Sequence, residues 1–140
     1  MSAIWNKPIS VEIINDFLKN TAAQHLGIEA VEVGDDFIRG RVAVDPKTRQ
    51  PYGILHGGVS VLLAETLASV AADYACAPGS QAFGLDINAN HLRSAAKGWV
   101  SAVAAPVHIG RSTQVWQIEL TDEQGRLVCV SRMTAAVLPK

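Results

Sequence analysis

This sequence has little charge and few cysteines, and its first residues do not predict a signal peptide. Its 140 residues contain two cysteines, Cys76 and Cys129, which lie far apart, so neither a disulfide framework nor a zinc site is expected. Charged residues make up 18% and the formal net charge is −1, which gives no electrostatic reason to expect nucleic acid or an acidic membrane surface as a partner. The first ten residues, MSAIWNKPIS, lack the apolar segment and cleavage site of a signal peptide. We therefore expect a cytoplasmic protein.

The chain offers only a poor candidate for a membrane span. Its most apolar window, residues 59–75, is interrupted by Glu65 and Asp73, whose charges a bilayer disfavours. The four histidines show no metal-ligand spacing, so no metal is expected, and no cofactor either. A hydrophobic content of 49% is typical of a globular protein. We expect residues 1–140 to form one domain with a sizeable core.

Hydrophobic periodicity predicts a helix, two strands, a second helix and then four strands. The first helix is expected over residues 10–20, with Ser10 as its N-cap, and the two strands within 27–44. A polar loop over 45–53 precedes the long apolar helix, which should end near Pro78-Gly79. The four later strands are expected within 82–92, 98–110, 112–122 and 126–138. In the first of them, Leu85, Ile87 and Ala89 alternate with polar residues, which predicts that these three share one face. Strands that cluster after one helix predict an α+β protein with an antiparallel sheet.

The long helix is apolar on nearly every side and must therefore be wrapped by something. Many of its residues are small and would let a sheet approach closely: Ala64, Ala68, Ala71, Ala72 and Ala75. A curved antiparallel sheet folded around one helix fits this pattern. Glu65, Ser69 and Asp73 recur at intervals of four and form one polar stripe. That stripe must face water, a subunit interface or a cleft.

Glu65 allows two interpretations. It is either the solvated edge of an amphipathic helix or a catalytic carboxylate on the floor of a cleft, where partial burial would strengthen it as a base. Ser69, one turn further on, would then orient it or hold a water molecule. Alternatively, the Ser69 hydroxyl merely bonds back to a helix carbonyl. The helix pattern alone leaves these alternatives open.

Gly57 and Gly58 stand where the loop becomes the helix. The first N–H groups of a helix have no internal partner and carry the positive end of its dipole. Glycine lets a ligand approach that backbone, which suits a developing oxyanion. The alternative is that the glycines only shape the turn. His56 beside them is a polar anchor, a base or an ordinary loop residue, and Gln50 either polarises a carbonyl or is an exposed loop glutamine.

The distance between these groups has a quaternary consequence. Eight positions separate Gly57 from Glu65, which is about 12 Å along an α-helix. An oxyanion donor must lie ~3 Å from the oxygen that it stabilises, and an attacking group ~3–3.5 Å from the same carbonyl carbon. One copy of the helix cannot supply both groups to one carbonyl. If both act, two subunits related by a two-fold axis must contribute them.

Six segments, in this order, carry a resemblance to a known family: RQPYGILHGG, LAET with a serine three positions later, INANHLR, VHIGR, QVWQIEL and DEQGRLVC. The sequence resembles the hotdog-fold acyl-CoA thioesterases, in the 4-hydroxybenzoyl-CoA thioesterase-like branch. It is similar to bacterial members that hydrolyse 1,4-dihydroxy-2-naphthoyl-CoA or proofread aryl carrier proteins. The resemblance covers nearly the whole chain. It implies a hotdog fold, an acyl-CoA substrate, an acyl or aryl carrier protein as a further partner, and homodimers with shared sites that pair into tetramers.

The resemblance also implies roles for particular residues. Glu65 matches the catalytic carboxylate, Gly57 the backbone donor to the thioester carbonyl, and Gln50 a side chain that polarises it. Supporting positions around the thioester or the attacking water are His56, Ser69 and His91. Positions that match contacts to the CoA moiety are Gly84, His91, Leu92, Arg93, Ser94, His108, Ile109, Gly110, Arg111, Ser112 and Thr113. Arg93 and Arg111 would meet phosphates, because guanidinium suits phosphate geometry.

Thioester hydrolysis is compatible with this set of residues. A thiolate leaves readily, because thiols titrate near ~8.5, so neither a strong general acid nor a Ser-His-Asp set is required. Three other interpretations remain open. One is a hotdog dehydratase or hydratase, although HGGVSVLLAE does not look like the motif of those families, which places prolines near a histidine. The others are a non-catalytic acyl-CoA binding protein and an unrelated lipid-binding module.

Overall fold

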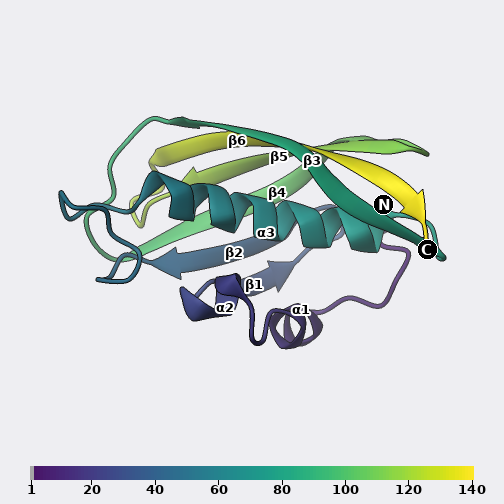
Figure 1. Ribbon diagram of the computed structural model, residues 1–140, viewed down its shortest axis with the longest axis horizontal. Coiled ribbons are helices and arrows are strands. Elements are labelled where there is room, and N and C mark those ends of the chain that lie inside the picture. The colour runs from purple at the N-terminus through teal and green to yellow at the C-terminus, as the bar shows by residue number, and fades with distance from the viewer. Residues whose placement is uncertain (1) are drawn as a thin grey trace.

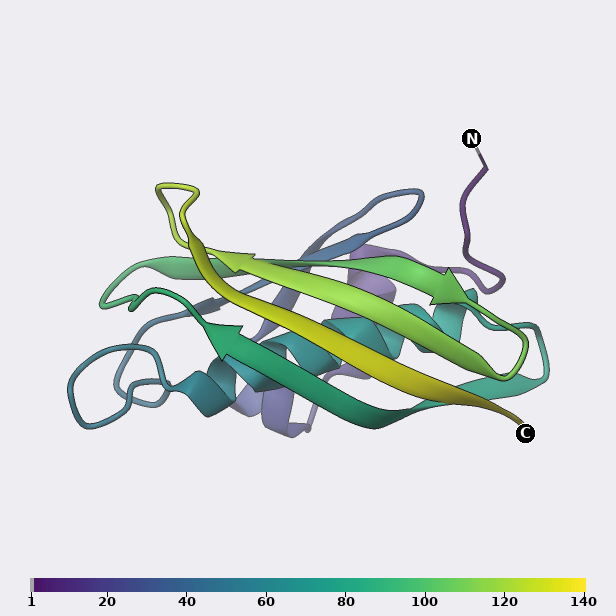
Figure 2. The ribbon, with the colours of Figure 1, turned by 90° about the horizontal axis from the view of Figure 1, so that it is seen from above.

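A computed structural model describes residues 2–140 as a curved six-stranded sheet around one long helix (Figures 1 and 2). The helices are α1 (Val11–Phe17), α2 (Ala22–His25) and α3 (Gly57–Ala75). The strands are β1 (Glu29–Val33), β2 (Ile38–Ala43), β3 (Ser80–His91), β4 (Trp99–Ile109), β5 (Thr113–Thr121) and β6 (Leu127–Pro139). They lie in the order β1-β2-β4-β5-β6-β3, and every neighbouring pair is antiparallel. The predicted hotdog architecture is confirmed.

The two short helices begin at side-chain caps. Ser10 accepts a hydrogen bond from the Ile13 N–H, as expected of an N-cap, and Thr21 accepts one from Gln24. The first helix is shorter than predicted and ends at Phe17. Sequence periodicity missed α2 altogether, because four residues are too few to show a helical repeat. Both helices lie on the side of α3 near β1 and β2 (Figure 1).

The helix α3 is the core of the molecule. Its fully buried residues face the sheet, among them Leu63, Leu67 and Ala71. Gly40 on β2 makes the close approach possible, since a Cβ there would lie 2.7 Å from Cδ2 of Leu67. By length and composition α3 could cross a membrane, but 56% of its apolar window is buried inside the molecule, as a core helix requires. It ends at Ala75, earlier than predicted.

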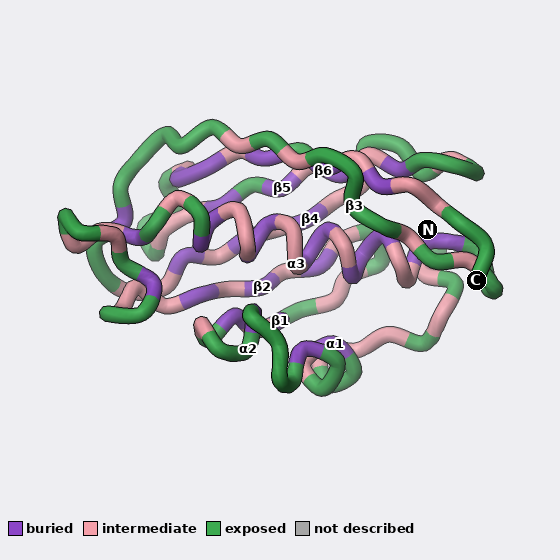
Figure 3. The backbone as a smooth tube through the Cα atoms, in the orientation of Figure 1, coloured by how far each residue is buried: buried purple, intermediate pink, exposed green. Residues whose placement is uncertain are grey.

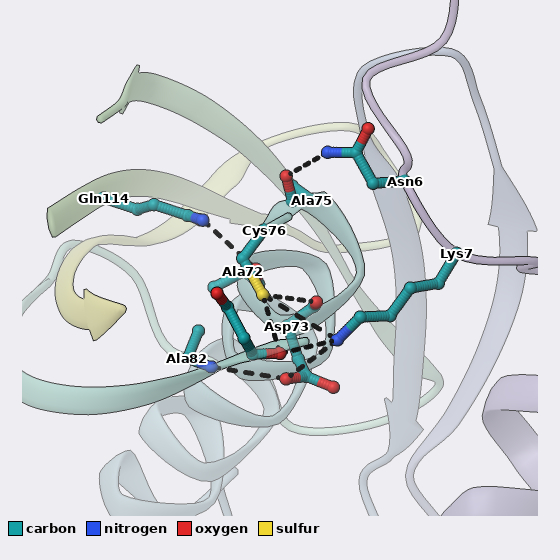
Figure 4. Close-up of polar contacts among 9 residues, drawn as sticks. Asn6, Lys7, Ala72, Asp73, Ala75, Cys76, Ala82 and Gln114 are labelled. Carbon is teal, nitrogen blue, oxygen red and sulfur yellow. Dashed lines mark hydrogen bonds and ion pairs between the residues drawn. The ribbon is translucent and has the colours of Figure 1, made fainter. Parts of the chain in front are cut away.

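Polar contacts hold the C-terminal end of α3 (Figure 4). The Ala75 carbonyl, one of the last in the helix, accepts a hydrogen bond from the Asn6 side chain at 2.8 Å. The Ala72 carbonyl accepts from the Cys76 N–H at 3.1 Å and also from the Gln114 side chain at 3.2 Å. The Lys7 ammonium lies 3.5 Å from Asp73, and a cation is favourable at this end of the helix dipole. The N-terminal segment with Asn6 and Lys7 therefore holds the C-terminal end of α3, from which the chain continues into β3.

The strand β3 is an edge of the sheet, and none of its twelve residues is buried (Figure 3). An irregularity in pairing between Gly84 and Asp86 shifts the alternation of its side chains. Leu85, predicted to share a face with Ile87 and Ala89, is 65% exposed, so that prediction is wrong, whereas Ile87 and Ala89 do pack against the core. This edge presents unpaired backbone groups and exposed apolar side chains.

Candidate active site

The first turn of α3 has one open backbone donor, the N–H of Gly57. His56 caps the helix: its Nδ1 accepts from the Gly58 N–H at 2.8 Å, and its carbonyl accepts from Val59 at 2.9 Å and Ser60 at 3.2 Å. Within residues 2–140, no acceptor is recorded for the Gly57 N–H. This amide points out of the helix at the positive end of its dipole, where it suits a developing negative charge.

The capping hydrogen bond indicates which tautomer the neutral, exposed His56 ring adopts. Because Nδ1 is the acceptor of a hydrogen bond, the neutral ring carries its proton on Nε2. Of the three roles left open by the sequence, the structure supports the polar anchor. The Nε2–H remains available as a donor.

A cleft of about 360 Å³ opens beside this turn. Six of the predicted site residues line it: Gln50, Gly57, His91, Leu92, Arg93 and Ser94. The His91 ring lies directly over Gly57, since a Cβ on that glycine would be 3.0 Å from Nε2 of His91. The absence of a side chain at position 57 therefore lets the imidazole pack against the backbone at the start of α3.

Gln50 is held in this cleft by the loop that carries it. Its backbone N–H donates to the Ile54 carbonyl at 2.9 Å, and its carbonyl accepts from Gly53 at 3.0 Å. Gly53 has a φ of 84°, which favours glycine and allows the tight turn. The Gln50 side-chain oxygen accepts from the Tyr52 N–H. Its NH₂ group is left to donate, which is the capacity needed to polarise a carbonyl.

Glu65 and Ser69 line a different cavity, of about 570 Å³, between α3 and the helices α1 and α2. Glu65 is half-buried, and no hydrogen bond or ion pair to its side chain is recorded in the described chain. Its carboxylate lies against β3, because a Cβ on Gly84 would be 3.1 Å from Oε2. The Ser69 hydroxyl donates to the sulfur of Met133 at 3.6 Å, so its oxygen is free to accept.

The remaining predicted substrate contacts, Gly84 and His108–Thr113, lie at the opposite end of the sheet from His91–Ser94. Through β6, His91 is in register with Leu120, whereas Gly84 is in register with Gln114. These two rows are six to seven residues apart on the strands, which corresponds to about 20 Å. The segment His108–Thr113 therefore lies at the Gly84 end and not with His91–Ser94. The sequence resemblance assigned both segments to contacts with one CoA moiety. Within a single chain the two segments lie too far apart to form one such site.

Cysteine and metal chemistry have no support in the described chain. Cys76 and Cys129 are both free and buried. Burial raises the pKa of the Cys129 thiol, which opposes formation of a nucleophilic thiolate. Among residues 2–140, no group of three or more His, Cys, Asp or Glu side chains is arranged to hold a metal ion.

A curved antiparallel sheet of six strands around one long helix is the architecture of the hotdog-fold thioesterases. Comparisons with known proteins agree. Residues 52–129 match the family model of the Thioesterase superfamily. A 1,4-dihydroxy-2-naphthoyl-CoA hydrolase from Escherichia coli is 48% identical over 136 residues, covering 96% of this chain and 99% of that protein. The proofreading thioesterase EntH from Cronobacter turicensis is 42% identical over 135 residues, covering 96% and 98%.

Solved structures give the same assignment. A crystal structure of a thioesterase from Haemophilus influenzae matches with a TM-score of 0.95 and 47% identity, and covers 97% of this chain and 95% of that one. The chain belongs to the thioesterase superfamily, and it is an enzyme that hydrolyses thioesters.

Proposed function

We propose that this enzyme hydrolyses the thioester of an aromatic acyl-CoA, of benzoyl or naphthoyl type, to the free acid and CoA. The observation that carries the proposal is the pair of open donors, the Gly57 N–H and the Gln50 amide, on one cleft. The name of the similar E. coli hydrolase supports an aryl-CoA substrate. An acyl or aryl carrier protein is a second source of the same kind of thioester. We further propose one hotdog domain over residues 1–140, a cytoplasmic location, and no metal or cofactor.

A shared site in a homodimer reconciles the separated groups. Gly57 and Glu65 of one chain line different cavities and stand about 12 Å apart along the helix. The exposed β3 edge offers backbone groups for pairing with a second copy around a two-fold axis. Such pairing would lay the two α3 helices antiparallel, with the tip of one near the middle of the other. Two such dimers would form the tetramer.

In this arrangement each step of the hydrolysis can be assigned to a particular residue. The thioester oxygen accepts from the Gly57 N–H and the Gln50 NH₂ of one protomer, with His56 and His91 beside them. Glu65 of the partner removes a proton from water, or attacks directly to give a mixed anhydride that water then opens. The C–O bond forms, the C–S bond breaks, and CoA leaves as a thiolate. Ser69 accepts a hydrogen bond from the attacking water.

The same dimer would bring the two separated substrate segments together. His91–Ser94 lies in the cleft with Gly57, and His108–Thr113 of the partner would approach it from the far end of the partner's sheet. Arg93 and Arg111 would then bind phosphates of one CoA from two chains.

A panel of thioesters tests the substrate class by release of free thiol. Aryl-CoA should be hydrolysed faster than short- or long-chain acyl-CoA. Binding without thiol release, or addition of water to a 2-enoyl thioester, would contradict the proposal.

Gly84→Ala is expected to lower kcat about tenfold without unfolding the protein. The new methyl group would lie 3.1 Å from Oε2 of Glu65 and push the carboxylate away, and small misplacements of a reacting group are costly. Steady-state kinetics and thermal unfolding measure the two effects. Asn88→Ala, on the same exposed strand, is the control and should keep both values. An unchanged kcat in Gly84→Ala would contradict the position given to Glu65.

A further inference from the structure

The cleft beside Gly57 is lined by one deeply buried hydroxyl group, that of Ser60 on α3. Only 2% of Ser60 is exposed. The other polar side chains that line this cleft are half-buried or exposed: Gln50, His91, Arg93 and Ser94. Among the cleft residues of the described chain, Ser60 is therefore the polar one that is best shielded from bulk water.

The Ser60 hydroxyl is not used within the helix. A serine inside a helix commonly donates to the carbonyl four residues earlier. For Ser60 that carbonyl belongs to His56, and it already accepts from the Val59 N–H at 2.9 Å and the Ser60 N–H at 3.2 Å. No hydrogen bond of the hydroxyl is recorded within residues 2–140, although every fully buried side-chain polar atom there has a partner. The oxygen is therefore reached from the cleft that Ser60 lines.

A serine at this position has a cost that an alanine would not have. Serine is less favourable than alanine inside a helix, and a hydroxyl that is buried without a partner loses its hydrogen bonds to water. Elsewhere α3 fills small buried positions with alanine, as at Ala64, Ala68 and Ala71. A hydroxyl kept in this cleft is explained if it binds a group of the substrate.

The position of Ser60 indicates which group that is. Ser60 follows Gly57 by three positions, about 4.5 Å along the helix and on the same side of it. In the proposed function the thioester oxygen accepts from the Gly57 N–H, and the segment His91–Ser94 on the same cleft contacts CoA. The thioester sulfur joins these two parts of the substrate, and it is bonded to the carbon that carries the oxygen. The sulfur must therefore lie in this cleft, close to the Gly57 amide.

We propose that the Ser60 hydroxyl donates a hydrogen bond to the sulfur of the leaving CoA as the C–S bond breaks. The inference rests on the proposed function, because it requires the thioester oxygen at Gly57. The electron pair of the C–S bond goes to the sulfur, the carbonyl re-forms from the oxyanion, and Ser60 keeps its proton.

This contact strengthens during the reaction. The sulfur of the bound thioester is neutral and a weak acceptor, like that of a thioether. The sulfur of the thiolate is charged, and hydrogen bonds to charged groups are roughly twice as strong as those between neutral groups. Ser60 therefore stabilises the transition state for loss of the thiol more than it stabilises the bound substrate, which is the requirement for a catalytic contact.

Ser60→Ala tests the contact in two ways. With benzoyl-CoA as substrate, the variant should lower kcat and kcat/KM together by about tenfold, because the contact forms only as charge develops on the sulfur. Inhibition by CoA and by desulfo-CoA, which has hydrogen in place of the thiol, is then measured over a pH series through the titration of the thiol. Once that thiol is ionised, CoA should bind the variant about fivefold more weakly than the wild type, whereas desulfo-CoA should bind both equally.

Ser131→Ala is the matched control. Ser131 is as deeply buried as Ser60, but its hydroxyl donates to the Asn88 carbonyl at 2.8 Å and it lines none of the three cavities around α3. It should keep wild-type kinetics and both inhibition constants. Thermal unfolding checks that both variants are folded.

The outcomes separate this inference from the proposed function. An unchanged kcat/KM in folded Ser60→Ala would overturn the inference. Equal weakening of CoA and desulfo-CoA would also overturn it, because Ser60 would then act on another part of CoA or on local packing. If the wild-type enzyme released thiol from no aryl thioester, the proposed substrate class would fail, while the comparison of CoA with desulfo-CoA would still test Ser60. Aryl turnover by the wild type with an unaffected variant would reject the Ser60 contact alone.

Discussion

Glu65→Ala is expected to fold normally and to lose about 10²-fold or more in kcat, as follows from removing a positioned base or nucleophile. The side chain is half-buried on α3, and no ion pair or hydrogen bond to it is recorded in residues 2–140. Its removal therefore breaks no recorded contact that stabilises the fold. Loss of an interaction made only in the transition state should lower kcat and kcat/KM together.

Thiol release under steady-state conditions measures this effect, and circular dichroism with thermal unfolding checks the fold. Glu119→Ala is the matched control, since Glu119 is an exposed acid on β5 that lines none of the cavities around α3. The control should keep wild-type kinetics. Near wild-type turnover by Glu65→Ala would exclude the catalytic role proposed for this residue.

Gln50→Ala should also be severely impaired, by about 10²-fold in kcat. Loss of one donor to a developing oxyanion typically costs ~10²–10³-fold, and the Gly57 N–H would remain as the second donor. The Gln50 oxygen is already occupied by the Tyr52 N–H, so its NH₂ group is the part that acts on substrate. Gln124→Ala, in the exposed β5–β6 turn, is the control. A variant that changes only KM would mean that Gln50 binds substrate and transition state equally.

The sequence predicts the core of this fold well because its signals are local. The small, apolar face of α3 requires a wrapping sheet, and the strands show alternation. Three details fail for identifiable reasons. The helix α2 is too short for periodicity, α3 ends before Pro78, and an irregularity in the pairing of β3 turns Leu85 outward. No local pattern encodes such a shift, because it depends on pairing with β6.

The candidate site is predictable in part. Gln50, Gly57 and the His91–Ser94 segment were assigned from motifs, and the structure brings them into one cleft. Their chemical roles stay predictions. The register of strand pairing determines which strand ends meet, and turns and neighbouring strands set that register. The separation of His108–Thr113 from His91 could therefore not be predicted from the sequence. Phe17 was missed as well, because it reaches the cavity of Ser69 only through packing of α1 beside α3.

A mixture of two inactive variants tests the central claim, that each site takes Glu65 from one protomer and Gln50 with Gly57 from its partner. Glu65→Ala and Gln50→Ala would be unfolded together in equal amounts and refolded, with exchange confirmed by mass-tagged chains. If sites are shared, each mixed dimer has one intact site and one site lacking both groups. Random pairing then restores about a quarter of wild-type activity, from two equivalent sites per dimer. If the mixture stays at the level of the separate variants after confirmed exchange, both groups act within one chain and the account is wrong.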